Sequence, residues 1–391
     1  MHELLSLPLS PVSIRQRGIA LNIQALILAA GFSRRMGRFK PLLFLDGKTA
    51  LARCVESFRQ SGIIDITVVT GHRHQEVAGA CAQLGVNWVY NPDYAQGMFS
   101  SVLTGVSSLP AQAEAFFLLP VDIPLVRPWT IAQTALRYHQ HAPLVASPCF
   151  QKHRGHPPLI STELKKPIAA HEGHGGLRHV LQHVEDQSLD VDTFDHNILL
   201  DMDRPEDFAQ AEQRASSLVR LDREEAWTLI QSVYPISEAG LAHGLAVAQT
   251  AEAMTIALNR AGCSVDVELA YVCGLVHDLA KGQPRHEEAG GRLLYCMGLD
   301  HMAPIVAAHR DLTLLKDQDI TAKEVVYLAD KLTRGSQRVS VRDRFQEKLD
   351  LFSHDPQAVA AISRRLANAL TVQARMESIL SCSVQEIVPD L

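Results

Sequence analysis

The alternation of short apolar stretches with amphipathic ones is the feature that most constrains how this chain can fold. Apolar stretches of strand length stand at residues 24–30, 65–71, 86–91 and 115–122, with helical periodicity between them at 49–62, 74–84 and 98–108. Apolar strands separated by helices indicate a parallel sheet that is covered on both faces. Two further strands and a closing helix are predicted at 142–148, 156–161 and 204–218. We therefore predict an α/β fold with a doubly wound, mainly parallel sheet, whose ligands bind beyond the carboxyl ends of the strands.

The strand pattern stops near residue 220, and only helical periodicity follows. The predicted helices cover residues 222–235, 237–262, 266–282, 287–298, 301–310, 322–333 and much of 341–380. A chain of 391 residues is also long for a single domain. We expect a first domain over residues 22–215 and an all-α second domain over 222–385, joined through the polar segment 209–222. Residues 1–21 are expected to form a tail without an export signal.

Charge, hydropathy and cysteine usage argue against several classes of protein. The net charge of −6 gives no reason to expect a nucleic-acid-binding protein. No apolar run reaches the roughly 18 residues that a membrane span needs. The seven cysteines are odd in number and form no CxxC pair, which favours reduced thiols in a cytoplasm. We therefore expect a cytoplasmic protein with neither a nucleic-acid partner nor a membrane partner.

A basic loop that contains glycines follows the first predicted strand, in the stretch LAAGFSRRMGRFKPLL (28–43). It is neither a GxxxxGK[ST] loop nor a GxGxxG dinucleotide-binding loop. Gly31 and Gly37 let the backbone approach a phosphate chain closely. The cations among them are Arg34, Arg35, Arg38 and Lys40. Four cations in seven residues predict nearby anions, although a solvated basic loop would need none.

Carboxylates stand at two further places in the first half. Asp122 follows the apolar stretch in LLPVDIP, and Asp201 and Asp203 precede a helix that begins near Pro205. Mg²⁺ binds through one or two carboxylates together with the phosphates of its substrate, so these side chains suit a magnesium site. Taken singly, Asp122 would also suit a cap before Pro124, and Asp201 or Asp203 would suit an N-cap.

Together these segments resemble the molybdenum-cofactor nucleotidyltransferases. The shared motifs are LAAGxSxRMGxxKxLL, Asp-x-Pro after an apolar strand, RGHP and a final [DN]x[DN]xPEDx helix. QGMFSSVLTGV (96–106) and RGHPPLI (154–160) are similar to the branch that makes molybdopterin cytosine dinucleotide. The resemblance covers about residues 22–215 and implies a Rossmann-like fold. GHGGLR (173–178) departs from the family's Asp-x-Gly-x-Arg by having His174 at the Asp position, and Phe99 stands where a small residue is common.

The resemblance implies roles for individual residues. Arg35 and Lys40 would hold the triphosphate and, with Asp122, would be catalytic, while Asp122 and Asp203 would bind Mg²⁺. The residues implied to contact the nucleotide or its acceptor are Leu28, Ala29, Ala30, Gly31, Ser33, Arg35, Lys40, Thr70, Gly71, Gly97, Ser100, Ser101, Gly155 and His156. The implied reaction transfers CMP from CTP to molybdopterin and releases pyrophosphate, with a molybdenum hydroxylase apoprotein as a candidate partner. Because both reactants are anions, catalysis would consist of positioning and charge neutralisation.

Histidine and aspartate side chains recur on the predicted helices of the second half. His277 and Asp278 stand side by side near the end of an apolar segment. An unpaired buried carboxylate costs several kcal/mol, so Asp278 needs a cation beside it. The other members of the set are His243, His286, His309 and Asp330. A single histidine of this kind is more often a satisfied core or surface residue, so only the whole set is informative.

As a set, these residues resemble the signature of the HD phosphohydrolases, and His286 and His309 match the variant with two metals. HEEAGGRLL and VVYLADKL are similar to the bacterial HD-type dinucleoside tetraphosphate hydrolases, over about residues 240–340. The resemblance implies that all six are metal ligands and that Asp278 is catalytic and bridges the ions. Imidazole and carboxylate ligands suit one or two ions of iron, manganese or zinc, which would activate a water molecule. Lys281 and Arg310 are candidate phosphate contacts.

Three functions are consistent with these motifs. The first is a bifunctional enzyme, in which the cytidylyltransferase is fused to a metal-dependent phosphohydrolase acting on a nucleotide or phosphate ester. The second keeps the transferase fold but uses a sugar or alcohol phosphate as acceptor, against which the Lys-before-Pro order of RFKPLL argues. The third is a cofactor-maturation chaperone or nucleotide sensor, whose HD ligands would hold a structural metal.

Overall fold

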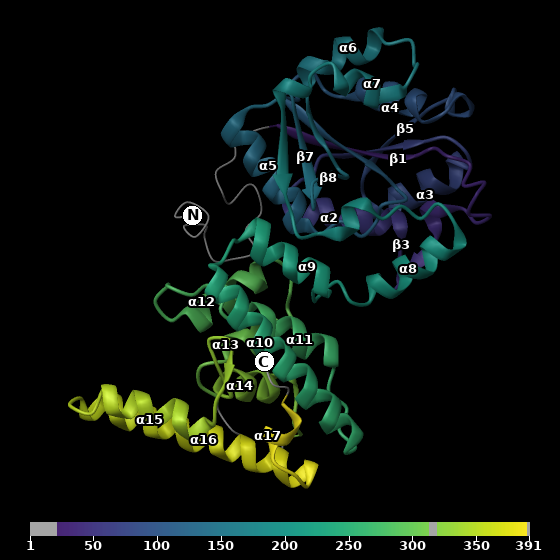
Figure 1. Cartoon of the computed structure of the whole chain (residues 1–391). Helices are drawn as coiled ribbons and strands as arrows, with labels where there is room; N and C mark the ends of the chain where they lie inside the picture. The colour runs from purple at the N-terminus through teal and green to yellow at the C-terminus, as the bar shows by residue number, and fades with distance from the viewer. Residues whose placement is uncertain (1–21, 313–318, 389–391) are drawn as a thin grey trace. The chain divides into compact units, whose positions relative to one another are not determined.

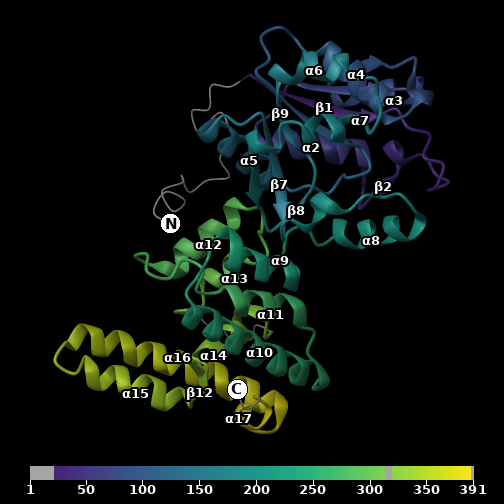
Figure 2. The same cartoon turned by 45° about the horizontal axis from the view of Figure 1, so that its top comes forward.

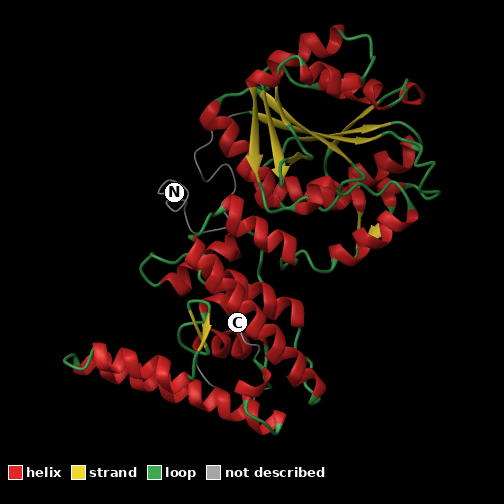
Figure 3. Ribbon diagram, in the orientation of Figure 1, coloured by secondary structure: helices red, strands yellow, loops and turns green. Residues whose placement is uncertain are grey.

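The computed structural model of the chain describes residues 22–312 and 319–388, so the predicted tail, residues 1–21, lies outside the described residues. The chain divides into two compact units, one up to Leu218 and the other from Val219. Figure 3 shows that the long strands gather in the first unit, whereas the described part of the second unit is helical apart from one short hairpin. Among the described residues, no helix combines the length and the apolar character that crossing a membrane requires.

A mostly parallel sheet forms the centre of the first unit (Figure 1). In the described residues it has eight strands, which are β1 (Ile23–Ala29), β4 (Ile66–Thr70), β5 (Asn87–Tyr90), β6 (Ala115–Pro120), β7 (Val145–Phe150), β8 (His153–Arg154), β9 (Leu159–Ser161) and β10 (Ser188–Asp192). The order across the sheet is β10-β7-β9-β6-β1-β4-β5, with β8 beside β7. β1 pairs in parallel with β4 and β6, while β8 and β9 run antiparallel to their neighbours. The predicted fold class is confirmed.

Helices cover both faces of this sheet. They are α2 (Ala50–Ser61), α3 (His74–Leu84), α4 (Met98–Ser108), α5 (Pro128–His141), α6 (Lys165–Ala170) and α7 (Gly176–Gln182). A further helix, α8 (Pro205–Ala215), packs instead against the segment Phe44–Leu45. A small hairpin of β2 (Phe44–Leu45) and β3 (Lys48–Thr49) follows the basic loop. α2 packs with α5, and α4 packs with α6 and α7.

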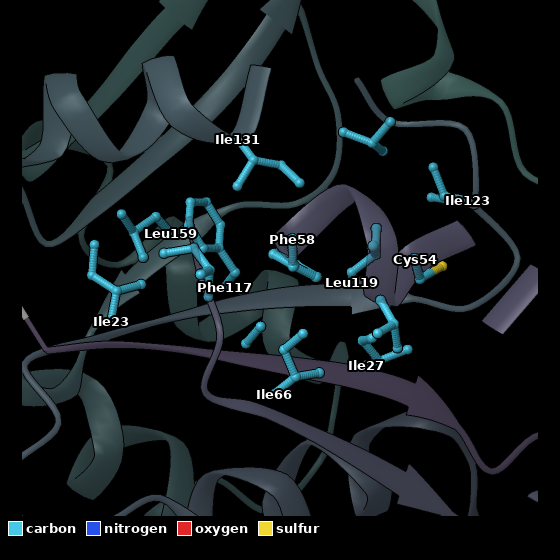
Figure 4. Close-up of a cluster of buried hydrophobic side chains, with 14 of the residues drawn as sticks. Ile23, Ile27, Cys54, Phe58, Ile66, Phe117, Leu119, Ile123, Ile131 and Leu159 are labelled. Atoms are coloured by element: carbon cyan, nitrogen blue, oxygen red, sulfur yellow. The ribbon is translucent and has the colours of Figure 1, made fainter. Parts of the chain in front are cut away.

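Strand β1 is buried on both faces, which explains why its sequence is apolar at nearly every position. Ile23 and Ile27 join the hydrophobic cluster that contains α2 and α5, whereas Leu26 and Leu28 join the cluster that contains α4. Successive side chains of a strand point to opposite faces, so both faces of β1 need apolar residues. Figure 4 shows the first cluster, in which Phe58, Phe117 and Ile131 come from α2, β6 and α5.

The second unit is a bundle of helices. They are α9 (Arg223–Thr228), which continues as the π-helical turn η7 (Leu229–Val233), then α10 (Glu238–Arg260), α11 (Val267–Val276), α12 (His286–Cys296), α13 (Ala303–Ala307), α14 (Ala322–Lys331), α15 (Val341–Leu351), α16 (Pro356–Leu380) and α17 (Val384–Ile387). The hairpin of β11 (Thr333–Arg334) and β12 (Gln337–Arg338) follows α14. α10 packs against α11 and α14, and α15 lies along α16 (Figure 2).

Two glycines allow α10 and α11 to pack at close range. A Cβ atom on Gly244 would lie 2.5 Å from the carbonyl oxygen of Leu275, and one on Gly274 would lie 2.9 Å from Cα of Ala248. Larger side chains at these positions would push the helices apart. This close approach brings His243 of α10 near the end of α11.

Several predicted boundaries were wrong. The helix predicted over 266–282 ends at Val276, and the helix predicted over 301–310 covers only Ala303–Ala307. α5, α6, α7 and β10 were not predicted. β10 has the sequence SLDVD and lies at the edge of the sheet with only Val191 buried, so it lacks the apolar signal of an inner strand. Pro128 at the first turn of α5 is a helix-start signal that the sequence did offer.

Candidate functional sites

Lys40 joins two distant carboxylates at the carboxyl end of the sheet. Its Nζ donates to Asp122 Oδ2 at 2.9 Å and to Asp203 Oδ1 at 2.7 Å. Asp122 follows β6, and Asp203 precedes α8. Burial of Lys40 would lower its pKa, but the two carboxylates outweigh burial and raise the pKa above its ordinary value. Lys40 therefore remains charged at neutral pH.

Asp201 and Asp203 do not cap α8, although either would suit an N-cap by sequence. The residue before the helix is Arg204, whose N–H donates to the side chain of Asp207 at 2.8 Å. The carboxylates of Asp201 and Asp203 are thus left for other contacts. Sequence position alone could not separate these two possibilities, because a cap and a site residue occupy the same place before a helix.

Negative charge accumulates around Lys40. Arg35 Nη2 lies 2.7 Å from Asp203 Oδ2, and burial together with the charges of Asp203 and Asp122 raises the pKa of Asp201. Within the described part of the chain, three carboxylates therefore gather beside two cations. Mg²⁺ binds through one or two protein carboxylates and completes its shell with water and substrate phosphates, so this donor set fits Mg²⁺.

The other two cations of the basic loop lie against aromatic rings. The guanidinium of Arg34 stands 4.5 Å from the ring centre of Phe32, and that of Arg38 stands 5.0 Å from the ring centre of Phe208. Cations over aromatic faces gain a modest electrostatic stabilisation. Arg34 and Arg38 therefore have aromatic partners within the chain, and the expectation that the cations of the loop meet anions stays a prediction.

A pocket opens beside Lys40. The predicted residues that line it are Leu28, Ala30, Gly31, Ser33, Lys40, Gly97, Ser101 and Asp122. Further lining residues, which the sequence did not reveal, are Pro41, Tyr94, Met98, Pro120 and Val121. Ser33 has a positive φ of 56° and its Oγ accepts the backbone N–H of Lys40 at 3.1 Å, so the loop is curled toward the pocket by its own contacts.

Asn91 organises the far side of this pocket and was missed by sequence reasoning. It is buried, and its side-chain amide donates to Ser100 Oγ at 2.9 Å and to Ser101 Oγ at 3.0 Å. Its Oδ1 accepts the N–H of Asp93 at 2.9 Å. Asn91 thereby fixes the first turn of α4. A polar residue closing the predicted strand 86–91 was the available signal.

The remaining predicted contact residues support the pocket rather than line it in the described structure. Ala29 is buried within β1. Thr70 is buried, and its Oγ1 donates to the carbonyl of Val89 at 3.1 Å. A Cβ on Gly71 would lie 2.6 Å from Tyr94 Cβ, and one on Gly155 would lie 2.5 Å from the carbonyl oxygen of Ile198. Both glycines therefore allow close backbone packing.

His156 is the last predicted contact residue of the first unit, and it follows Gly155 in RGHP. Its backbone N–H donates to the carbonyl of Ile198 at 3.0 Å. Burial lowers the pKa of His156, and the charge of Asp122 opposes that effect. His156 is therefore close enough to Asp122 for their charges to interact.

In the second unit, five predicted ligands come together in two groups that share Asp278. The first group contains His243, His277 and Asp278, and the second contains Asp278, His286 and His309. Within each group the possible ligand atoms lie within 4.8 Å of one another. Asp278 Oδ1 is 3.4 Å from His286 Nε2 and 3.5 Å from His309 Nε2, while Oδ2 is 3.7 Å from His277 Nε2. Asp278 is thus placed where it could bridge two ions.

Backbone carbonyls orient three of the imidazoles. The Nδ1 atoms of His243, His277 and His309 lie 2.9, 2.8 and 2.7 Å from the carbonyl oxygens of Gly335, Gly274 and Val306. Histidine ligands commonly place one ring nitrogen on such a partner, which directs the other nitrogen toward the metal. The Nε2 atoms of these histidines accordingly face the shared centre.

His277 gives the clearest indication that a metal ion belongs here. Its Nε2 is buried and has no hydrogen-bond partner among the residues that the structure describes. Burial and the neighbouring His309 lower the pKa of His277 to about 4, so the ring is neutral at physiological pH. Burial would raise the pKa of Asp278, but contacts with His286 and His309 outweigh it and hold that pKa far below its ordinary range. Both side chains are in the protonation state that binds metal, and the donor set fits a transition metal.

Asp330 lies beside the first group but belongs to neither. Its Oδ1 is 3.3 Å from His243 Nε2 and 3.8 Å from His277 Nε2. Burial would raise its pKa, but the adjacent Lys331 and other neighbours lower that pKa well below its ordinary value.

The two predicted phosphate contacts both have carboxylate neighbours. Lys281 Nζ lies 2.6 Å from Asp278 Oδ2, and Arg310 Nη1 lies 3.5 Å from Glu287 Oε1. Sequence reasoning did not single out Glu287.

Comparison with known families assigns both units. The model of the MobA-like NTP transferase domain matches residues 25–189, and the model of the HD domain matches residues 240–335. The chain joins a MobA-like NTP transferase domain to an HD domain. The two matches fall on the α/β unit and on the helical unit, and they contain the Lys40 pocket and the histidine groups.

Individual relatives are similar to the transferase domain. The chain is 29% identical over 205 residues to the molybdenum cofactor cytidylyltransferase of Escherichia coli, a match that covers 50% of this chain and 98% of that protein. It is 44% identical over 106 residues to the bifunctional IPC transferase and DIPP synthase of Rubrobacter xylanophilus, and 32% identical over 113 residues to the bifunctional protein GlmU of Legionella pneumophila. These two matches each cover only 24% of the relative's length.

Solved structures of similar proteins cover the same half of the chain. The protein Rv0371c of Mycobacterium tuberculosis is 24% identical with a TM-score of 0.45, and the match covers 50% of this chain and 98% of that one. A nucleotidyl transferase of Methanothermobacter is 23% identical with a TM-score of 0.44 over the same shares.

Proposed function

We propose that the transferase domain moves CMP from CTP to molybdopterin and releases pyrophosphate, in a reaction that requires Mg²⁺. The observation that carries this proposal is Lys40, held between Asp122 and Asp203 beside an open pocket. The similarity to a molybdenum cofactor cytidylyltransferase along nearly all of that protein's length supports the choice of substrates. The seven cysteines form no disulfide, which is consistent with a cytoplasmic location.

The residues of the pocket would act mainly through charge. Lys40 stays cationic where the leaving pyrophosphate must be stabilised, and exposed Arg35 can swing from Asp203 to the phosphate chain. Asp122 and Asp203 would hold Mg²⁺, which supplies further neutralisation of phosphate charge. The Asn91–Ser101 contact fixes the opposite side of the pocket. Positioning and electrostatic stabilisation are sufficient for this reaction, so no protein nucleophile is needed.

A nucleotide panel tests the choice of base and acceptor. Purified protein would be given CTP, GTP, ATP or UTP with molybdopterin and Mg²⁺, and pyrophosphate release would be followed. We expect release with CTP that depends on molybdopterin. Release with GTP alone would overturn the assignment of the cytidylyl group.

Another phosphorylated acceptor is the second candidate for this domain. It is favoured by the 44% identity over 106 residues to the bifunctional IPC transferase and DIPP synthase of Rubrobacter xylanophilus. Adding sugar phosphates and alcohol phosphates to the same panel separates the candidates, because pyrophosphate release should depend on the presence of the true acceptor.

We further propose that the HD domain is a metal-dependent phosphohydrolase that acts on a nucleotide or phosphate ester. His243, His277, Asp278, His286 and His309 would hold one or two ions of iron, manganese or zinc, which supply an activated water and bind a phosphoryl oxygen when present. The orphaned Nε2 of His277 is the observation that carries this proposal. Lys281, which is exposed and pairs with Asp278, would contact a phosphate beside that carboxylate.

Metal content and hydrolysis test this second activity together. Protein prepared without oxygen would be analysed for bound metals, and phosphatase activity would be compared with that of His277→Ala. We expect bound transition metal in the natural chain, and loss of both metal and activity in the variant. Substoichiometric metal with unchanged hydrolysis in His277→Ala would contradict the proposal.

A further inference from the structure

A helix beyond the part of the chain that matches the HD family contacts Asp330, which lies beside the first histidine group. The family match ends at residue 335, whereas α15 covers Val341–Leu351 and packs on α16. From α15, the Nη2 atom of Arg344 donates to Asp330 Oδ1 at 3.0 Å. The side chain of Arg344 is only 16% exposed. Arg344 therefore makes its contacts inside the domain and is largely shielded from solvent.

Both oxygens of Asp330 are held by cations, but the two contacts differ. Lys331 Nζ donates to Oδ2 at 2.7 Å and to the carbonyl oxygen of His309 at 2.7 Å. Arg344 instead contacts Oδ1, which is the oxygen that faces His243 Nε2 at 3.3 Å and His277 Nε2 at 3.8 Å. The position of this oxygen relative to the imidazoles thus depends on Arg344.

The guanidinium of Arg344 is itself anchored. Its Nη1 donates to the carbonyl oxygen of Thr333, while Nη2 donates to Asp330. A planar guanidinium with two fixed partners defines the direction of its hydrogen bonds, whereas an ammonium group is a point charge on a flexible stem. Arg344 can therefore fix the rotation of the Asp330 carboxylate in a way that Lys331 cannot.

We propose that Arg344 is a positioning residue of the metal centre, and that the α15–α16 pair helps to form this centre by holding Arg344 against Asp330. Arg344 turns Asp330 Oδ1 toward the orphaned Nε2 of His277 and so adds a carboxylate to the group of His243, His277 and Asp278. This inference rests on the proposed metal centre of the HD domain. It adds that an element outside the family's boundaries controls how tightly that group binds its ion.

Metal titration of the full chain tests this role without any substrate. The protein would be stripped with a chelator and titrated with Mn²⁺, and binding would be followed by calorimetry. Arg344→Gln should weaken binding of one ion by about 10- to 100-fold, the usual effect of losing a residue that orients a ligand. The ion in the group of Asp278, His286 and His309 should be affected less. Arg344→Lys keeps the charge but loses the planar fork, so it should recover only part of the affinity.

Arg334→Gln is the matched control. Arg334 also bonds to α15, through Glu347, but both side chains are exposed and neither contacts Asp330. We expect affinity for Mn²⁺ close to that of the natural chain. If Arg334→Gln lost as much affinity as Arg344→Gln, simple docking of α15 would explain the effect, and the inference would be wrong.

Two other outcomes separate this inference from the proposal beneath it. Unchanged Mn²⁺ affinity in Arg344→Gln and Arg344→Lys, with normal binding by the natural chain, would overturn the role of Arg344 alone. A natural chain that binds no Mn²⁺ or other transition metal would overturn the metal centre, and this inference with it. Circular dichroism checks that each variant is folded, and should Arg344→Gln fail to fold, Arg344→Lys decides the question by the same criterion.

Discussion

At the scale of single residues, Lys40 has the most decisive environment in the transferase domain. It is almost fully buried and joins Asp122 and Asp203, which are 81 residues apart in the chain. Removing one partner from such a group leaves the other charges uncompensated. The lysine is therefore needed both to arrange the two carboxylates and to neutralise phosphate charge.

Replacing Lys40 should abolish most of the transferase activity. We expect Lys40→Met to reduce the rate of pyrophosphate release by about 10²- to 10³-fold, the usual cost of losing one electrostatic group from a transition state. Arg38→Met is the matched control from the same loop, because Arg38 lies over Phe208 instead of a carboxylate. Its rate should stay near that of the natural chain. Equal losses in both variants would show that the loop needs only its net charge.

Buried His277 of the HD domain should make folding stability depend on pH. The pKa of His277 is about 4 in the folded chain and has its ordinary value of 6.5 when unfolded. Between these values the unfolded state binds the proton more readily, so folding stability is full above pH 6.5 and falls as the pH drops toward 4. In metal-free protein, the free energy of unfolding should fall by about 2 kcal/mol between pH 7.5 and pH 5.

Hydrogen exchange in α10 and α11 measures this loss, once the rates are corrected for the intrinsic effect of pH. His277→Gln should remove most of the dependence of folding stability on pH between 7.5 and 5. The carboxylates of Asp278 and Asp330 have lowered pKa values, so their contributions are lost only at pH values below the ordinary carboxyl range. Identical pH profiles for the variant and the natural chain would contradict the account.

Sequence reasoning found candidate site residues where several polar groups stand together in a short stretch. The neighbours His277 and Asp278, and the loop that holds Lys40, are evident because polar groups interrupt apolar surroundings. Asn91 and Arg344 escaped because their importance arises from partners across the fold, at Ser101 and Asp330. A single polar residue in a sequence does not reveal which distant atom it will contact.

At the scale of secondary-structure elements, strands buried inside the sheet were easier to predict than a strand at its edge. β1 was predictable since both its faces are buried, whereas β10 is a polar edge strand. α4 shows how an element positions the site, because its first turn carries Ser101 and its middle packs on the sheet. A Cβ at Gly105 would lie 3.0 Å from Val69 and 3.1 Å from Leu26.

A larger side chain at Gly105 should displace α4. We expect Gly105→Val to destabilise the transferase domain by about 1–3 kcal/mol, as overpacking in a dense core does. Gly79→Val is the control, since Gly79 is also helical and a Cβ there meets nothing within 4 Å. Urea unfolding of both variants measures the difference. Equal stability would show that the α4 contact is not tightly packed.

At the scale of the whole molecule, the chain is two compact units, and each contains its own candidate site. Their division falls between Leu218 and Val219, and each candidate site lies within one unit. We predict that residues 22–218 and 219–391 fold when expressed separately. Each should show a cooperative unfolding transition, and the first should retain CTP-dependent activity. Aggregation or loss of structure in either fragment would show that the units depend on each other to fold.

The fate of the α-phosphorus of CTP decides whether the centre of Lys40, Asp122 and Asp203 transfers the cytidylyl group of CTP to molybdopterin. The full chain would be given CTP labelled at that atom, together with molybdopterin and Mg²⁺, and the products would be separated. We expect the label to appear joined to molybdopterin, and we expect Asp122→Asn to abolish this product. Label found only in free CMP, or transfer from GTP but not from CTP, would contradict this expectation.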